Sequence, residues 1–283
     1  MVVDASAGSI EANARIARRA SRVVVLARFE GRRILSHPAF LGALALATLI
    51  GGVSAWISSA PIRGAEYGWR ATVVVTTSLL AMATVLAANA AGRRERASGT
   101  GELFDATATS RSRRTTAQLL SSAWPSSMTI VVVAAAVVLL AVRGGQHLEV
   151  ADALRLAQVP LVVAGFSALG TALGRLSPMP APAIFAATLA FFLPFPADGE
   201  RPLDWLAPFA SWGWSSLPSL GWHAVYLLGG VVAISSLALI VTGARRRAAL
   251  VLALAIAAGA GAATFQLPVE CHDVDLVGKV CTF

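Results

Sequence analysis

Long stretches of uncharged, mostly apolar residues recur along the chain, and most of them are about 20 residues in length. A helix of that length crosses the ~30 Å hydrocarbon core of a bilayer and satisfies its own backbone hydrogen bonds. The chain is 56% hydrophobic and only 13% charged, far from the composition of soluble proteins. The sequence therefore predicts an integral membrane protein of the all-α class, a polytopic bundle of transmembrane helices. The predicted spans are 39–58, 71–91, 117–142, 156–174, 181–195, 222–242 and 248–266, the fifth being short.

The arginines predict the orientation of these spans. Of the 23 basic residues all but Lys279 are arginine, and short cytoplasmic loops collect such charges. With a cytoplasmic N-terminus, 17 arginines face the cytoplasm and five face outside together with Lys279. Trp56, Trp69 and Trp222 then fall at outer ends, where aromatic rings prefer the membrane interface. We predict a multi-pass protein of the plasma membrane with an extracytoplasmic C-terminal tail.

The net charge of +8 does not predict a nucleic-acid-binding protein. The arginines are dispersed along the inner boundary without a recognisable nucleic-acid module, so membrane lipids and a partner protein explain them better. Residues 1–38 are too interrupted by charge to be a cleavable signal sequence. From about residue 10 to 36 their pattern predicts an amphipathic helix lying in the inner interface, which His37 and Pro38 end. A solvated basic tail is the alternative.

The loop 92–116 between the second and third spans is the most informative soluble segment. Gly99 and Gly101 allow a tight turn after a run of arginines. Glu102 then lies near the positive end of a short helix that exposes Leu103 and Phe104, a pattern that favours docking of a partner. An ordinary positive-inside loop is the alternative.

Two segments resemble the ABC-2 type permeases, the membrane subunits of ATP-binding-cassette exporters of the type V architecture. The sequence ARFEGRRILSHPAFLGALALATLI from Ala27 is similar to the interfacial helix and first span of the family. The sequence RRERASGTGELFDATATSRSRR from Arg93 is similar to its coupling segment, although Ala108 stands where the family often has proline. The resemblance implies a six-span permease domain at 39–247, followed here by a seventh span at 248–266.

The resemblance also implies partners and functional residues. Two copies of a separate cytoplasmic ATPase, which bind ATP and Mg, and a second permease copy are expected, while this chain binds no cofactor or metal. The exported substrate is expected to be hydrophobic or amphiphilic. The residues expected to contact the ATPase are Glu30, Arg32, Arg33, Glu95, Arg96, Gly99, Thr100, Glu102, Leu103, Phe104 and Asp105.

The loop 195–221 is too aromatic and too rich in proline for a plain linker. In the family this position holds short re-entrant helices near the outer exit, so the resemblance implies an extracellular gate. The gate candidates are Trp205, Phe209, Trp212 and Trp214. A hairpin of the aromatic belt is the alternative.

The tail 267–283 contains the two cysteines, Cys271 and Cys281. An oxidising exterior favours a disulfide between them. A zinc site that also uses His272 is weaker, because structural zinc normally takes four protein ligands. The abrupt end at Phe283 is compatible with a longer polypeptide.

Missing motifs limit the function. Around Lys279 there is no GxxxxGK[ST] phosphate loop, so ATP hydrolysis requires another subunit. The chain has no HExxH or GxSxG motif, and we expect no enzyme activity and only interfacial roles for histidines such as His223. Polar span residues such as Ser126 and Gln158 are expected to bond between helices.

Two rival functions remain open. The predicted spans contain no Asp, Glu, Lys or Arg, which counts against an ion-coupled carrier. The other rival is a membrane anchor or assembly protein that displays an extracytoplasmic C-terminal domain.

Overall fold

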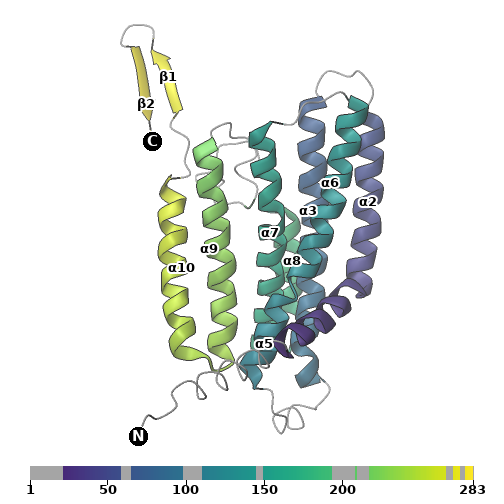
Figure 1. Ribbon diagram of the computed structural model, residues 1–283, viewed down its shortest axis with the longest axis vertical. Coiled ribbons are helices and arrows are strands. Elements are labelled where there is room, and N and C mark those ends of the chain that lie inside the picture. Colours follow the sequence, from purple (N-terminus) through teal and green to yellow (C-terminus); the bar gives the residue numbers. More distant parts are fainter. Residues whose placement is uncertain are drawn as a thin grey trace, which may run out of the picture.

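The structure, a computed structural model, describes residues 22–58, 65–97, 110–144, 149–192, 208, 217–265, 270–274 and 278–282. It is a bundle of long, roughly aligned helices followed by a two-stranded β hairpin (Figure 1). A helix over Arg22–Leu35 comes first and meets the next helix at a bend of 62°. The following elements are α2 (Pro38–Ser58), α3 (Ala65–Ala97), α5 (Arg111–Leu120), α6 (Ala123–Gly144), α7 (Val150–Leu176), α8 (Ala181–Phe192), α9 (Leu217–Val241), α10 (Arg245–Phe265), β1 (Glu270–Val274) and β2 (Gly278–Thr282).

The bundle confirms a helical, membrane-embedded protein. Among the described residues, five helical segments are long and apolar enough to cross a membrane, or up to six if Arg22–Leu35 and α2 form one bent span. α8 has 12 residues and is therefore about 18 Å long, shorter than a bilayer core. The predicted six-span core with a seventh span thus stays a prediction, because its fifth span, 181–195, runs past the described part of the chain.

Several predicted boundaries are displaced. α3 continues to Ala97, six residues past its predicted end at 91. The predicted span 117–142 contains a break between α5 and α6 at Ser121 and Ser122, the kind of polar pair at which helices bend. α7 begins at Val150 instead of 156, because Glu149 and Asp152 form a capping box that starts the helix earlier.

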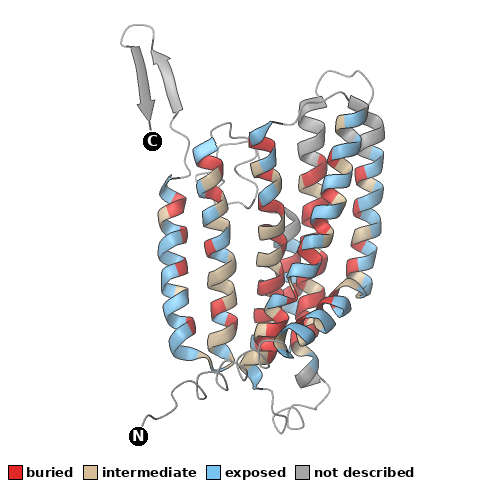
Figure 2. Cartoon of the chain, viewed as in Figure 1, coloured by how far each residue is buried: buried red, intermediate tan, exposed pale blue. Residues whose placement is uncertain are grey.

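Close glycine contacts hold α3 against α7. A Cβ at Gly170 would lie 2.4 Å from the carbonyl oxygen of Val85, and one at Gly174 would lie 2.7 Å from that of Asn89. Residue numbers rise together along this contact, so the two helices run parallel. Small residues allow membrane helices to approach this closely. α3 is the most buried membrane-spanning helix described (Figure 2).

α9 extends the bundle and carries α10. α9 packs against α7 in parallel, while α10 turns back along α9 and makes nearly all of its helix contacts with it. Gly229 faces the backbone of Gly259, where a Cβ would be 3.0 Å from the Gly259 Cα. Large apolar side chains on the outer faces of both helices are exposed, as expected of surfaces in contact with lipid (Figure 2).

The bundle has two chemically different ends. At the end that we call the arginine end, α3, α7 and α9 finish and α5, α8 and α10 begin (Figure 1). We call the opposite end, where α7 and α9 begin and α10 leads toward the strands, the hairpin end. The described arginines at the arginine end are Arg22, Arg28, Arg32, Arg33, Arg93, Arg94, Arg96, Arg111, Arg113, Arg114, Arg175, Arg245, Arg246 and Arg247.

Candidate functional site at the arginine end

The structure brings part of the predicted ATPase-docking set to one end of the bundle. Glu30, Arg32 and Arg33 lie on the helix Arg22–Leu35. The last turn of α3 contains Glu95 and Arg96. The other predicted docking residues lie outside the described residues: Gly99, Thr100, Glu102, Leu103, Phe104 and Asp105.

The helix Arg22–Leu35 packs on the bundle through one face. Ala27, Gly31 and Ile34 are buried on that face, at the spacing of successive helical turns. Gly31 lies against the indole ring of Trp124 in α6, where a Cβ would be 1.9 Å from the ring Cδ1. The glycine is therefore what lets this helix dock on the start of α6.

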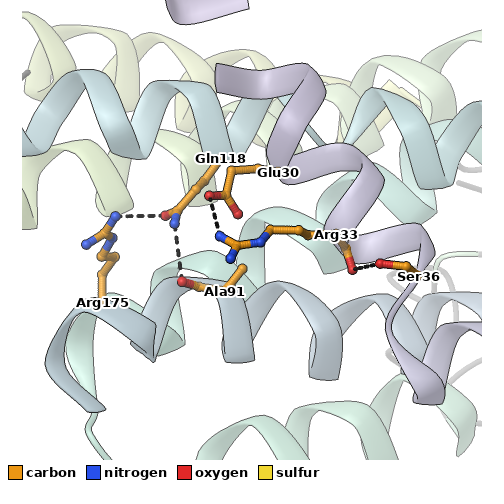
Figure 3. Close-up of polar contacts among 6 residues, drawn as sticks. All are labelled: Glu30, Arg33, Ser36, Ala91, Gln118 and Arg175. Carbon is orange, nitrogen blue, oxygen red and sulfur yellow. Dashed lines mark hydrogen bonds and ion pairs between the residues drawn. The ribbon is translucent and has the colours of Figure 1, made fainter. Parts of the chain in front are cut away.

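The opposite face of the helix is exposed and mixes apolar and basic side chains. Val25 is 66% exposed and Phe29 is 53% exposed. Arg33 lies over the Phe29 ring, with Cζ 4.6 Å from the ring centroid. Nη1 of Arg33 is also 3.6 Å from Oε1 of Glu30 (Figure 3). The Arg33 side chain is largely exposed and that of Glu30 is only partly so, and contacts of this kind near the surface contribute about 1 kcal/mol to stability. Together with the exposed Arg32, they form a surface suited to a headgroup region or to a partner protein.

Gln118 of α5 joins three helices behind this surface. Its Nε2 donates a hydrogen bond to the carbonyl oxygen of Ala91 in α3 at 3.3 Å, and its Oε1 accepts one from Nη2 of Arg175 in α7 at 2.9 Å (Figure 3). Gln118 and Arg175 are both buried. Because hydrogen bonds to charged groups are worth about 1.5–3 kcal/mol, the bond to Arg175 helps to hold α5 against α7.

His37 lies at the bend between the first helix and α2. Its Nδ1 accepts a hydrogen bond from the backbone N–H of Ala39 at 3.3 Å. Pro38 has no N–H, so Ala39 supplies the first backbone donor of α2. Partial burial, together with the positive charge of Arg94, lowers the pKa of His37 from its ordinary value of 6.5. The neutral ring therefore caps α2.

We expect this junction to lose stability as the pH falls through about 6.5. The folded chain binds the His37 proton at a lower pH than the unfolded chain, so stability present above that pH is lost on acidification. His37→Asn keeps an acceptor for the cap, worth about 1 kcal/mol, but cannot titrate. Its thermal unfolding midpoint should therefore fall less than the parent's between about pH 7.5 and pH 5.5. Equal falls in the two proteins would contradict this assignment.

α7 extends beyond the predicted span 156–174 at both ends. The predicted span itself contains no charged residue, but the added turns of α7 contain Asp152, Arg155 and Arg175, all of them buried. Nη1 of Arg155 donates a hydrogen bond to Oδ1 of Asp152 within a buried ion pair. Buried ionisable groups therefore lie near both ends of α7, which weakens the argument against an ion-coupled carrier.

Buried polar side chains also join α7 and α9 near the hairpin end. His223, predicted to be interfacial, is instead fully buried in α9, and its Nε2 is 3.3 Å from the carbonyl oxygen of Pro208. Nε2 of Gln158 donates to the carbonyl oxygen of Leu220 at 3.1 Å. Ser126 Oγ likewise donates across helices, from α6 to a carbonyl oxygen of α7. The prediction that polar span residues bond between helices is thus confirmed for Gln158 and Ser126, whereas Ser127 and Thr129, predicted in the same way, donate to carbonyl oxygens of their own helix α6.

The outer-gate and cysteine predictions are tested only in part. The gate candidates Trp205, Phe209, Trp212 and Trp214 lie outside the described residues. Cys271 and Cys281 are direct partners in the antiparallel register of β1 and β2. Such partners have Cα atoms about 4.5–5.5 Å apart, within the range that a disulfide spans. The disulfide stays a prediction, and the hairpin itself was not predicted.

The described residues show no metal site, and comparison with known proteins identifies no family. Among the described residues, no cluster of three or more His, Cys, Asp or Glu side chains is arranged to hold a metal ion. A scan against models of protein families finds no match, and a search of curated proteins finds no relative. The resemblance to ABC-2 type permeases thus rests on the two motif-bearing segments of the sequence.

Proposed function

We propose that this chain is the membrane-spanning subunit of an ATP-driven exporter of the ABC-2 type, located in the plasma membrane with its arginine end in the cytoplasm. The observation that carries the proposal is the helix Arg22–Leu35. It bends by 62° from α2, docks through Gly31, and presents an exposed basic and apolar face beside the end of α3. The similarity of its sequence to the family's interfacial helix supports the same role.

The contacts of this helix supply a route from a docked ATPase into the bundle. Ile34 packs with Ala87 and Ala88 of α3. From the other side, α5 continues from the coupling segment, and its Gln118 bonds to both α3 and α7. A partner that presses on either element would therefore move α3. Two ATPase copies would act on two permease copies, and a hydrophobic or amphiphilic substrate would pass between them.

Copurification tests the proposal. The full-length protein is isolated in mild detergent from its native membranes, and copurifying P-loop ATPases are identified by mass spectrometry and by ATPase activity. The variants Arg32→Glu/Arg33→Glu and Glu102→Arg/Leu103→Asp should each recover at least about tenfold less ATPase than the parent, the equivalent of about 1.4 kcal/mol of binding.

A matched control separates docking from charge. Arg246→Glu/Arg247→Glu makes the same charge change as Arg32→Glu/Arg33→Glu at the same end of the bundle, but on α10, which packs on α9. This variant should recover as much ATPase as the parent. Equal losses in all three variants, or no ATPase with the parent, would contradict the proposed interface.

The buried charges of α7 favour a second candidate, an ion-coupled carrier. Asp152, Arg155 and the fully buried His223 are the kind of groups that such carriers place within their spans. This candidate predicts transport that collapses with the ion gradient and ignores ATP. A protein with neither an ATPase partner nor ion-coupled transport would instead fit the membrane-anchor function.

A further inference from the structure

The groove between α7 and α9 contains two glycines that helix packing does not explain. Gly230 of α9 lines the groove, and a Cβ there would meet no atom within 4 Å. Gly165 lines it from α7, and its Cβ would meet only Cγ2 of Val231, at 3.4 Å. By contrast, Gly170 permits a backbone contact that any side chain would break. Gly165 and Gly230 therefore keep a space open.

The groove is long, narrow and apolar. Its volume is about 170 Å³. It follows α7 from Leu161 to Leu169 and α9 from Tyr226 to Ile234, a length of about 12 Å at the rise of an α-helix. An apolar cavity of about 150 Å³ in a soluble protein stays dry and takes up a hydrocarbon ligand. This groove is larger and lies between two membrane-spanning helices, so water is a poor occupant.

Polar groups lie at one end of the groove only. Tyr226, the lining residue of α9 nearest the hairpin end, lies beside His223, with ring centroids 5.5 Å apart. The Pro208 carbonyl group, which contacts His223, belongs to another lining residue. From Tyr226 toward the middle of the bundle the lining is apolar: Leu161, Val162, Phe166, Leu169, Leu227, Val231 and Ile234. The groove thus matches a molecule with a polar group toward the hairpin end and a hydrocarbon chain below it.

We propose that this groove binds one acyl chain of a bilayer phospholipid, with the headgroup toward the hairpin end. The direction agrees with that of a lipid in the leaflet at this end, whose chains point toward the bilayer centre. Gly165 and Gly230 admit the chain, and Phe166 and Ile234 line its path. Lipid binding here requires no ATPase partner, so it stands apart from the proposed transport function.

Photolabelling in vesicles tests the site. The full-length protein is reconstituted with a phospholipid that carries a diazirine near the middle of one acyl chain, without nucleotide, and labelled peptides are mapped by mass spectrometry. Peptides from Leu161–Leu169 and Tyr226–Ile234 should be labelled about tenfold more than those from the exposed faces of α2 and α10. Such a ratio corresponds to roughly two additional buried methylene groups. Uniform labelling of all exposed helices would overturn the proposal.

Variants that fill the groove give a second readout. Gly230→Phe and Gly165→Leu enter it from opposite walls, and each should lower groove labelling about tenfold. Gly52→Phe is the matched control, because Gly52 is exposed on α2 with no atom near its Cβ position, and it should change nothing. Labelling that survives either filled variant, or crosslinks between two copies of the groove in its place, would contradict lipid binding. If one variant does not fold, the other and the parent labelling ratio still decide.

Discussion

Replacing Gly170 with leucine should leave little folded protein. A Cβ at this position would lie 2.4 Å from the carbonyl oxygen of Val85 and 3.0 Å from its Cα. Both atoms are backbone, so no side-chain rotation relieves the clash, and α3 and α7 have to separate. Overpacking commonly costs about 1–3 kcal/mol even where side chains can adjust, against a total stability of about 5–15 kcal/mol. Thermal unfolding in mild detergent, with the yield of monodisperse protein, measures the effect.

Two further variants bracket this result. Gly170→Ala should be intermediate, because it adds only the clashing Cβ. Gly42→Leu introduces the larger side chain on the exposed face of α2, where a Cβ meets no atom within 4 Å, and should match the parent. A Gly170→Leu protein that unfolds at the parent's temperature would refute the close packing of α3 and α7.

Asp152→Ala should destabilise the bundle by about 3–5 kcal/mol, the cost of removing one partner of a buried ion pair. Asp152 and Arg155 are 7% and 3% exposed, so the arginine would lose its carboxylate in a region that water reaches poorly. The same change removes Oδ2 of Asp152, which accepts a hydrogen bond from the backbone N–H of Glu149 at 3.2 Å. Chemical or thermal unfolding of the purified proteins measures the loss.

Paired substitutions separate the charge from the helix cap. Asp152→Asn retains an acceptor for the cap and should fall between the parent and Asp152→Ala. Asp152→Leu/Arg155→Leu removes both charges and should recover much of the loss, since apolar replacements of buried ion pairs are often neutral or better. Should Asp152→Ala be as stable as the parent, the pair would have to be open to water.

The sequence predicted the helices well because crossing a bilayer imposes a length and an apolar composition that can be read directly. An observed helix overlaps each predicted span. The helix within 181–195, α8, has only 12 residues. The predicted bend at His37 and Pro38 is also present. These features depend on local composition and on proline geometry, which sequence patterns record.

The interior of the bundle was harder to predict. Composition placed the start of the fourth span after Arg155, because charged residues are usually excluded from spans. The capping box of Glu149 and Asp152, visible as carboxylates three residues apart, was the missed signal. The burial of His223 was missed for a different reason: it depends on tertiary packing that brings the Pro208 carbonyl group, 15 residues away, next to the ring.

α10 determines the end of the bundle at which the chain leaves it. It makes nearly all of its helix contacts with α9, so the rest of the bundle is built without it. α10 adds one more crossing of the bundle, so the chain leaves the bundle at the end opposite to the one where α9 finishes. The β hairpin accordingly lies beyond the end opposite the helix Arg22–Leu35 (Figure 1). The packing of α10 on α9, which includes the close approach of Gly229 to Gly259, thus places the start of the last strands at the hairpin end and not at the arginine end.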